Sequence, residues 1–335
     1  MIPLRAPEFW WKKAGAAAAL LYPAGAIYGA VTTYRLARKG YRAKIPVICI
    51  GNPTLGGAGK TPTAVAIGGW LKREGKKVFF LTRGYGGSEV GPLLVDLSKH
   101  GAREIGDEAP LLAGVAPTIV ARDRAAGAKF AEANGADILV MDDGFQNSSL
   151  VKDFSVLVVD GAKGLGNGLS FPAGPLRAPL APQFKRAQAM IVVGEGEAGA
   201  KAARLAKEHA LQLFQAKLVP DEMSAAEVRN RSVFAFAGIG APEKFFHSLE
   251  AAGAIVAAWK SFGDHHRYTK ADAAELLARA EHGGLDLVTT EKDLARMRGD
   301  DGLAQLREKS KALRVRLALD DENGALATIR NSLKI

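Results

Sequence analysis

Residues 47–63 read V-I-C-I-G-N-P-T-L-G-G-A-G-K-T-P-T, an apolar run followed by a glycine-rich loop and a Lys-Thr pair. The β-branched run predicts a buried strand. The loop fits the pattern G-x-x-x-x-G-K-[ST] except at its first position, where Thr54 replaces glycine. Phosphate oxygens approach backbone N–H groups most closely where side chains are absent, so the glycines of this loop suit phosphate binding. We therefore expect a strand, a phosphate loop and a helix that begins at Thr61.

The Lys-Thr pair defines the chemistry expected of this loop. Lys60 is expected to reach the β- and γ-phosphates of a nucleoside triphosphate, and Thr61 to bind Mg²⁺. The following helix contributes free N–H groups and the positive end of its dipole, and Pro62 fits its first turn. The alternative, an ordinary strand-to-helix turn, leaves the Gly-Lys-Thr sequence to chance. The residues expected to bind ATP are Thr54, Leu55, Gly56, Gly57, Ala58, Gly59, Lys60 and Thr61.

Length and charge narrow the class of protein. A chain of 335 residues exceeds the usual size of a single core, so two domains are expected. Lys and Arg outnumber Asp and Glu by 45 to 35, which favours anionic partners. No zinc-finger spacing or RNA-binding signature is present, so nucleic acid is not an expected partner. The single cysteine, Cys49, excludes a disulfide framework within the chain and is expected to be a small buried apolar residue.

Residues 14–34 contain no charged residue and are flanked by Trp and Lys on one side and by Arg and Lys on the other. This composition predicts a membrane-associating helix within an N-terminal segment, residues 1–40. A helix that spans a bilayer needs about 20 strongly apolar residues. This stretch is instead rich in Ala and Gly and contains Pro23. An interfacial helix is therefore favoured over a true span, a buried core helix or a cleaved signal peptide.

Further apolar runs alternate with Ala-rich helical stretches. This alternation predicts an α/β fold with a doubly wound parallel sheet of the P-loop NTPase type. Ligands of such sheets bind beyond the carboxyl ends of the strands, so the residues that follow each run are candidate site residues. The expected strands lie at residues 77–81, 118–121, 138–141, 156–159 and 190–193.

A polar helical segment near residues 221–231 separates this pattern from a new apolar strand at 233–237. We place a domain boundary there. The P-loop core domain is expected over residues 41–228. A second, smaller α/β domain that closes over the active site is expected over residues 229–335.

Two aspartates end one of the predicted strands. The sequence A-D-I-L-V-M-D-D-G-F-Q has the form of a Walker B strand, with Asp142 and Asp143 at its tip. Mg²⁺ is a hard cation that proteins hold through few carboxylates, so these side chains are candidate metal ligands beside Thr61. A turn is the alternative, because Asp-Asp-Gly also favours turns.

Two other polar clusters stand out. Asp107, in I-G-D-E-A-P, is either a functional carboxylate or the N-cap of the next helix, and the residues alone leave both open. In D-H-H, the adjacent histidines 265 and 266 would point to opposite faces of an extended segment, which disfavours a shared metal. One histidine that acts as an acid, a base or an orienting group is the better interpretation, and solvated loop histidines are the alternative.

The ordered set of motifs resembles the tetraacyldisaccharide 4'-kinase family of lipid A synthesis. The motifs are G-N-P-T-L-G-G-A-G-K-T-P, T-R-G-Y-G-G, G-D-E, D-D-G-F-Q, G-P-L-R-A-P, F-A-G-I-G-A-P, D-H-H and T-E-K-D, and they span residues 51–293. The resemblance implies a kinase that uses ATP and Mg²⁺ to phosphorylate the 4'-hydroxyl of a lipid A disaccharide 1-phosphate. It also implies a location on the cytoplasmic face of the Gram-negative inner membrane, with no obligate protein partner.

The resemblance also implies residue roles. Asp107 is similar to the family's catalytic base, and His265 to the histidine that pairs with it across the domain cleft. Such a pair suits phosphoryl transfer, which needs in-line positioning, charge neutralisation by groups such as Lys60, and a modest base. The residues of the matching motifs that are expected to contact substrate are Arg83, Glu108, Gln146 and Arg177, the last in a long Gly/Pro-rich loop.

Two other nucleotide-binding classes are alternatives. The L-G-G-A-G-K-T run also resembles partitioning-type ATPases, which act as nucleotide-dependent membrane or partner switches. Their second lysine near the start of the loop is missing here, where the sequence reads N-P-T-L. A GTPase would need N-K-x-D for guanine, and T-E-K-D does not fit that register.

Overall fold

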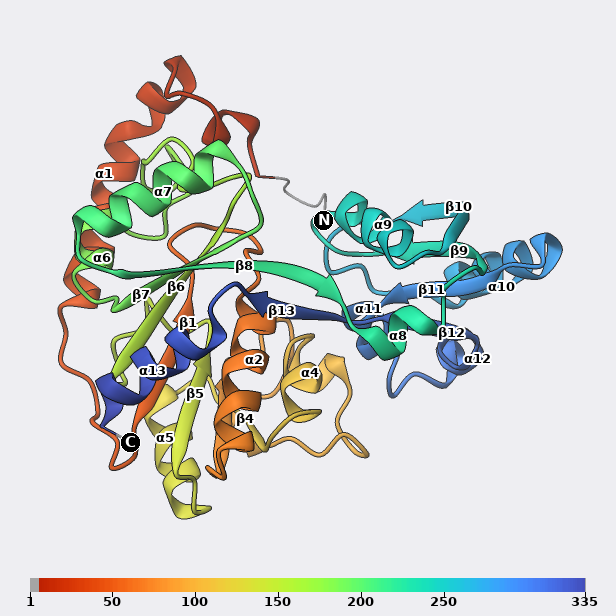
Figure 1. Ribbon diagram of the computed structural model, residues 1–335, viewed down its shortest axis with the longest axis horizontal. Helices are drawn as coiled ribbons and strands as arrows, with labels where there is room; N and C mark the ends of the chain where they lie inside the picture. The colour runs from red at the N-terminus through yellow and green to blue at the C-terminus, as the bar shows by residue number, and fades with distance from the viewer. Residues whose placement is uncertain (1–5, 335) are drawn as a thin grey trace.

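The computed structural model describes residues 6–334, which form two β-sheets joined by a pair of antiparallel strands (Figure 1). In this range the larger sheet has nine strands in the order β13-β8-β7-β6-β1-β5-β2-β4-β3, and the smaller has four in the order β10-β9-β11-β12. The strand that precedes the phosphate loop, β1 (Val47–Gly51), lies in the middle of the larger sheet and pairs in parallel with β5 and β6. The phosphate loop therefore lies at the centre of the carboxyl edge of this sheet.

The larger sheet is parallel except at its two edges, where β3 and β13 run antiparallel to their neighbours. Every residue of β1, β2 and β5 is buried, as expected for parallel strands covered on both faces. The remaining strands of this sheet are β2 (Val78–Thr82), β3 (Leu93–Leu94), β4 (Thr118–Val120), β5 (Ile138–Asp142), β6 (Phe154–Asp160), β7 (Ala189–Val193), β8 (Gln212–Pro220) and β13 (Val315–Leu319).

Helices cover both faces of the larger sheet, which confirms the doubly wound class. One face packs against α2 (Lys60–Arg73), α4 (Ala109–Ala113) and α13 (Glu322–Leu333). The other packs against α5 (Arg124–Ala133), α6 (Leu180–Phe184) and α7 (Glu197–Glu208). The short helix α3 (Ala102–Ile105) precedes α4 and lies beside it.

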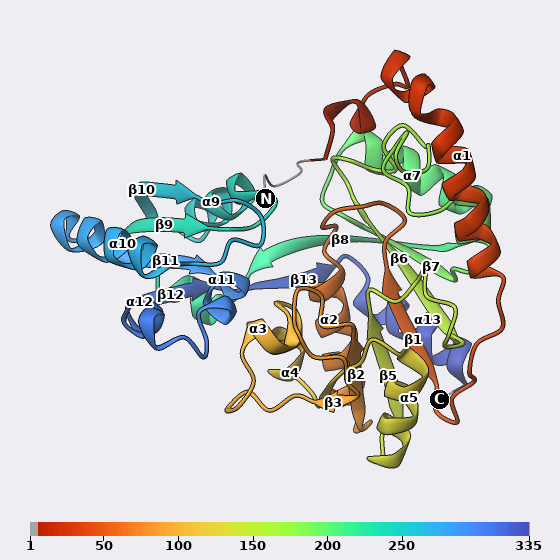
Figure 2. The same cartoon turned by 180° about the vertical axis from the view of Figure 1, so that it is seen from behind.

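The smaller sheet is also covered on both faces. Its strands are β9 (Ser232–Ala237), β10 (Ile255–Ser261), β11 (Asp286–Thr290) and β12 (Ser310–Leu313). The helices α8 (Glu222–Ala226) and α9 (Pro242–Ala251) pack on one side, and α10 (Lys270–Gly283), η2 (Asp301–Leu303) and α12 (Ala304–Lys309) on the other. The helix α11 (Glu291–Arg296) follows β11 and lies beside α3 and α4 of the larger unit (Figure 2).

The end of the chain corrects the expected domain range of residues 229–335. Strand β13 leaves the smaller sheet and pairs with β8 from Val315 opposite Pro220 to Leu319 opposite Ala216. Helix α13 then buries Ile329 in the core of the larger unit. Residues 315–333 therefore belong to the larger sheet. No separate element is expected there from the sequence, and an alternating strand pattern does not say which sheet edge a strand joins.

The N-terminal segment forms η1 (Glu8–Trp11) and α1 (Ala16–Leu36), and residues 1–5 of the expected range lie outside the described residues. Helix α1 packs through Gly25 and Gly29 on the loop before α6, where a Cβ would come within 2.9 Å of the Ser170 carbonyl or 3.1 Å of Pro179. Leu20 and Ile27 are 83% and 69% exposed. Among the described residues, α1 is the single helix long and apolar enough to cross a membrane, and most of it is not buried. The buried core helix alternative is therefore wrong.

Candidate active site

The phosphate loop has the backbone geometry of a cradle. Gly56 and Gly59 have φ angles of +103° and +91°, which favour glycine. A Cβ added at Gly56 or Gly57 would meet nothing within 4 Å, so the backbone there faces open space. Helix α2 begins at Lys60, one residue earlier than expected, and its first residues line the same space.

These residues face a large cleft of about 2710 Å³ between the two sheets. Residues 55–61 line this cleft. Thr54 is instead buried beneath the loop, where its carbonyl oxygen accepts a hydrogen bond from Arg177. All four expected substrate residues, Arg83, Glu108, Gln146 and Arg177, also line the cleft. Glutamine 146 directs its side-chain amide at the backbone of Asn52, at a distance of 3.0 Å, and so supports the loop from beside it.

The residues expected to bind Mg²⁺ lie together at the tips of α2 and β5. The Thr61 hydroxyl donates a hydrogen bond to Asp142 Oδ2 at 2.9 Å. The other oxygen, Asp142 Oδ1, is buried and has no hydrogen-bond partner among the described residues. Burial and the neighbouring Asp143 carboxylate raise the pKa of Asp142 to about 6. A buried, unpaired carboxylate oxygen next to a hydroxyl and a phosphate loop fits the oxygen ligands that Mg²⁺ prefers.

Asp143 faces two cations. It has a φ of +52°, lies 3.9 Å from Lys60 Nζ, and accepts a 3.0 Å hydrogen bond from Arg177 Nη1. Burial raises the pKa of Asp143, but Lys60 and Arg177 outweigh it and hold the pKa below its ordinary value. Burial also lowers the pKa of Lys60. The site therefore holds an ionised carboxylate and a desolvated cation within reach of the phosphate cradle.

The Gly/Pro-rich loop at residues 161–182 supports the phosphate loop. Its Arg177 donates from Nε to the Thr54 carbonyl at 3.1 Å and from its backbone N–H to the Pro53 carbonyl at 2.8 Å. In return, the Leu55 N–H donates to the Pro175 carbonyl at 2.8 Å. These contacts hold the two loops together, so Arg177 joins the phosphate loop to Asp143.

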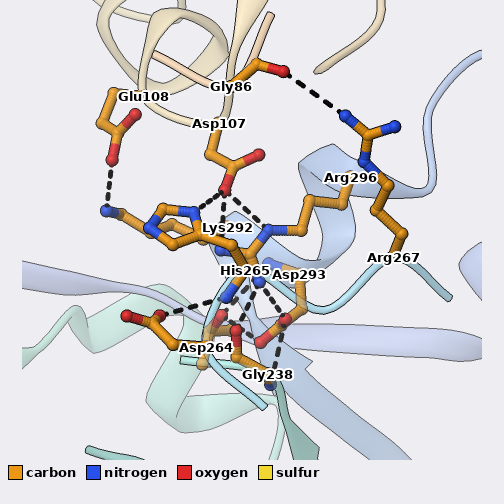
Figure 3. Close-up of polar contacts among 11 residues, drawn as sticks. Gly86, Asp107, Glu108, Gly238, Asp264, His265, Arg267, Lys292, Asp293 and Arg296 are labelled. Atoms are coloured by element: carbon orange, nitrogen blue, oxygen red, sulfur yellow. Dashed lines mark hydrogen bonds and ion pairs between the residues drawn. The ribbon is translucent and has the colours of Figure 1, made fainter. Parts of the chain in front are cut away.

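The second half of the site comes from both sheets. Asp107 follows α3, and His265 lies in the loop after β10 with a φ of +56°. His265 Nδ1 lies 2.7 Å from Asp107 Oδ2, and Arg296 Nε donates to the same oxygen at 2.8 Å (Figure 3). The N-cap position of α4 is Glu108, without a side-chain cap bond, so the N-cap alternative for Asp107 is wrong.

The pKa directions distinguish the members of this pair. Burial raises the pKa of Asp107, but the hydrogen bond from His265 and the charge of Arg296 outweigh it and hold the pKa below its ordinary value. The hydrogen bond to Asp107 raises the pKa of His265. His265 lines the cleft. Asp107 is only 9% exposed and is not among the described residues that line the cleft. His266 turns away and contacts Asp272 at 3.1 Å, as expected of adjacent side chains.

Three residues at this site were not singled out from the sequence. Lys292 donates to Glu108 at 2.9 Å, Arg296 contacts Asp107, and the ring of Tyr85 lies 5.8 Å from the ring of His265. Tyr85 and Lys292 stand inside the quoted motifs T-R-G-Y-G-G and T-E-K-D. Arg296 lies three residues after Asp293, a spacing that pairs side chains on one face of a helix and could have identified it.

Comparisons with known proteins agree with this architecture. The family description Tetraacyldisaccharide-1-P 4'-kinase matches residues 17–334. A tetraacyldisaccharide 4'-kinase of Nitrobacter hamburgensis is 50% identical over 316 residues, 94% of each chain. Another, of Methylobacterium nodulans, is 54% identical over 295 residues, 88% of each chain. The crystal structure of LpxK from Aquifex aeolicus in complex with ATP superimposes with a TM-score of 0.75 at 25% identity, covering 95% of this chain and 100% of that one.

These matches confirm the family resemblance, the mixed α/β fold with an apolar N-terminal helix, and the expected class of enzyme. They cover both sheets and the phosphate loop rather than one motif. The chain therefore belongs to the tetraacyldisaccharide-1-P 4'-kinase family and is a kinase of that family.

Proposed function

We propose that this chain transfers the γ-phosphoryl group of ATP to the 4'-hydroxyl of a tetraacyldisaccharide 1-phosphate during lipid A biosynthesis. Its family and the names of its relatives support the reaction. The observation that carries the proposal is the 2.7 Å contact between His265 and Asp107, which joins the two sheets beside the cleft that the phosphate loop lines. A hydroxyl acceptor needs such a base, whereas a nucleotide switch does not.

The phosphate loop and the tips of α2 and β5 hold the nucleotide. The backbone N–H groups around Gly57 and the N-terminus of α2 bind phosphate oxygens, and Lys60 contacts the transferred group. Thr61 and Asp142 would provide oxygen ligands for Mg²⁺, with Asp143 close by. When bound, Mg²⁺ would neutralise charge on the phosphate oxygens. Arg177 holds Asp143 and the phosphate loop in fixed positions relative to each other.

The geometry favours the reverse of the roles expected from the resemblance, with His265 as the base and Asp107 as the residue that orients it. Asp107 is the weaker base, because Arg296 and His265 both address its Oδ2 and hold its pKa low. An ionised Asp107 accepts from the Nδ1–H of His265, which leaves Nε2 as the proton acceptor. His265 Nε2 takes the proton of the 4'-hydroxyl as its oxygen bonds to the γ-phosphorus. The bond from that phosphorus to the bridging oxygen breaks, and ADP leaves with the electron pair.

Location on the cytoplasmic face of the inner membrane, as a peripheral or monotopic protein, belongs to this proposal, and the exposed helix α1 supports its membrane association. Its exposed side chains include Leu20 and Ile27, and cations flank it on both sides. An exposed apolar helix with such flanks suits the interface of an anionic bilayer. The lipid acceptor lies in that bilayer, so the helix keeps the cleft close to its substrate.

The test is incubation with γ-labelled ATP, Mg²⁺ and a lipid A disaccharide 1-phosphate dispersed in vesicles or detergent. We expect label on the 4' position of the lipid and little ATP hydrolysis without acceptor. Slow hydrolysis that ignores the lipid, together with nucleotide-dependent dimerisation, would contradict this function and favour the partitioning-type switch.

A further inference from the structure

We infer that Arg296 is a positioning residue, which clamps Asp107 of the larger unit to Asp293 of the smaller unit and so fixes the Asp107–His265 pair for proton transfer. The inference rests on the proposed function, in which His265 takes the proton. It also gives a physical role to the T-E-K-D motif, which that mechanism leaves without one.

The contacts of Arg296 use nearly the whole guanidinium group. Its Nε donates to Asp107 Oδ2 at 2.8 Å, and Nη2 lies 2.7 Å from the same oxygen without the alignment of a hydrogen bond. Its Nη1 donates to the Gly238 carbonyl at 2.6 Å and to Asp293 Oδ1 at 2.8 Å (Figure 3). Arg296 is only 8% exposed and Asp293 is completely buried. A planar, permanently charged fork suits this bridge better than a lysine would.

The T-E-K-D motif holds the Asp293 end of this clamp in place. Thr290 is the N-cap of α11 and accepts from the Asp293 N–H at 3.1 Å, and its hydroxyl donates to Asp293 Oδ2 at 2.6 Å. Asp293 Oδ1 also accepts from the Gly238 N–H at 3.1 Å. The carbonyl of Gly238 in turn accepts from the backbone N–H of His265 at 3.1 Å. One buried framework therefore aims both Arg296 and His265 at Asp107.

The charge of Arg296 matters most before the proton moves. His265 must then be neutral, which would leave Asp107 as a buried carboxylate without a cation, a costly arrangement. Arg296 supplies that cation. The groups that face His265 are Asp107, Asp264, Arg296 and the ring of Tyr85. Asp107 and Asp264 raise the pKa of His265 and Arg296 opposes them, so Arg296 helps to keep the base unprotonated near neutral pH.

Three variants test this role through kcat measured across pH. Arg296→Gln removes the cation and should lower kcat at neutral pH about 100-fold and move the acid limb of the profile up by about one pH unit. Arg296→Lys keeps the positive charge but loses the forked guanidinium group. The acid limb should therefore stay at the same pH, and kcat should fall about tenfold. Arg103→Gln is the control, because the Arg103–Asp300 pair joins the same two units at 2.6 Å without touching Asp107. It should change kcat less than about twofold.

The Asp107→Asn background asks whether Arg296 acts through Asp107. Adding Arg296→Gln there should cost less than about threefold, because residues that act as a unit give strongly non-additive losses. Fully multiplicative losses, or an unchanged rate and acid limb in Arg296→Gln, would overturn the inference. Thermal unfolding and ATP affinity of each variant separate this effect from misfolding. If Arg296→Gln does not fold, Arg296→Lys becomes the test. A wild-type kcat in Arg296→Lys would then overturn the inference.

The same assays separate this inference from the proposed function. A wild-type enzyme that leaves the lipid unlabelled refutes the proposed function. A wild-type enzyme that labels the lipid, beside an Arg296→Gln variant with the same kcat and acid limb, refutes the clamp alone.

Discussion

The phosphate loop and the Asp107–His265 pair differ in how the chain builds them. The loop is contiguous, and short-range features form it: positive φ angles at Gly56 and Gly59 and the start of α2 at Lys60. The pair joins residues 158 positions apart that belong to different sheets. A change in the loop therefore acts locally on nucleotide phosphates, whereas the pair depends on how the two units meet. Variants in the two regions separate these local effects from effects on how the units meet.

Lys60→Ala should have the largest effect. Loss of a preorganised cation at the transferred phosphoryl group should lower kcat about 1000-fold, which is the upper range for removing one such contact. The apo protein should melt at nearly the same temperature, because Lys60 lies 3.9 Å from Asp143 and Arg177 still pairs with that carboxylate. Lipid phosphorylation at saturating ATP is the measurement. Lys72→Ala, at the far end of the same helix, is the control, and near wild-type turnover in Lys60→Ala would rule out the loop assignment.

The second effect concerns Asp107→Ala, His265→Ala and the double variant. Each single change should lower kcat about 100-fold, and the double variant little further, because the two side chains act as one unit. The KM for ATP should hardly move, since neither side chain holds the nucleotide. Losses that multiply in the double variant would show independent roles, and a loss confined to the KM for ATP would make both residues nucleotide ligands.

The third effect appears in the pH profile of Asp107→Asn. The base must be neutral, so wild-type kcat should fall as the pH drops below the pKa of His265, which Asp107 raises. An amide removes that influence, so the acid limb should move to lower pH by about one pH unit. The relative rate on the acid side then rises by up to about tenfold although the maximal rate falls. An acid limb at the same pH in both proteins would mean that another group titrates.

A smaller effect is expected for Arg177→Gln, which cuts the link between Asp143 and the Thr54 carbonyl. The loop stays closed by its backbone bonds to Pro53 and Pro175, so the loss should be about fivefold and mainly in the KM for ATP. Arg186→Gln is the matched control, because the one side-chain hydrogen bond of Arg186 among the described residues goes to the carbonyl of Pro182. A loss confined to the KM for the lipid would assign Arg177 to the acceptor instead.

The smallest effect on turnover is expected from the double variant Leu20→Gln/Ile27→Gln on the exposed side of α1. Neither side chain is among the described residues that line the cleft, so kcat with a detergent-dispersed acceptor should change less than about twofold. Binding to anionic vesicles should fall at least about tenfold, as two large apolar side chains no longer enter the interface. Sedimentation with vesicles measures this. Ile255→Gln, which removes an apolar side chain 57% exposed on the smaller sheet, should not release the protein. Equal release of both variants would contradict a specific role for α1.

The sequence alone supports much of the larger unit. Buried β-branched runs and the loop glycines predict the strands and the cradle, because burial of parallel strands and positive φ angles impose requirements on single residues. The strand tips at Arg83 and Asp142 follow from the rule that parallel strands place their carboxyl ends at one edge. The expected domain ranges placed the residues of β13 in the smaller domain and were wrong there, since an alternating strand pattern is compatible with either sheet.

The sequence by itself determined the phosphate loop, the Asp pair and the apolar character of α1, because each depends on neighbouring residues along the chain. The family resemblance added the pairing of Asp107 with His265 but not its charge balance. Tertiary structure alone decided that Arg296 and Lys292 of α11 meet Asp107 and Glu108. It also decided that His265 faces the cleft with Asp107 behind it. The physical reason is that such contacts depend on how two separately folded sheets are held together by β8 and β13, and no local pattern encodes that geometry.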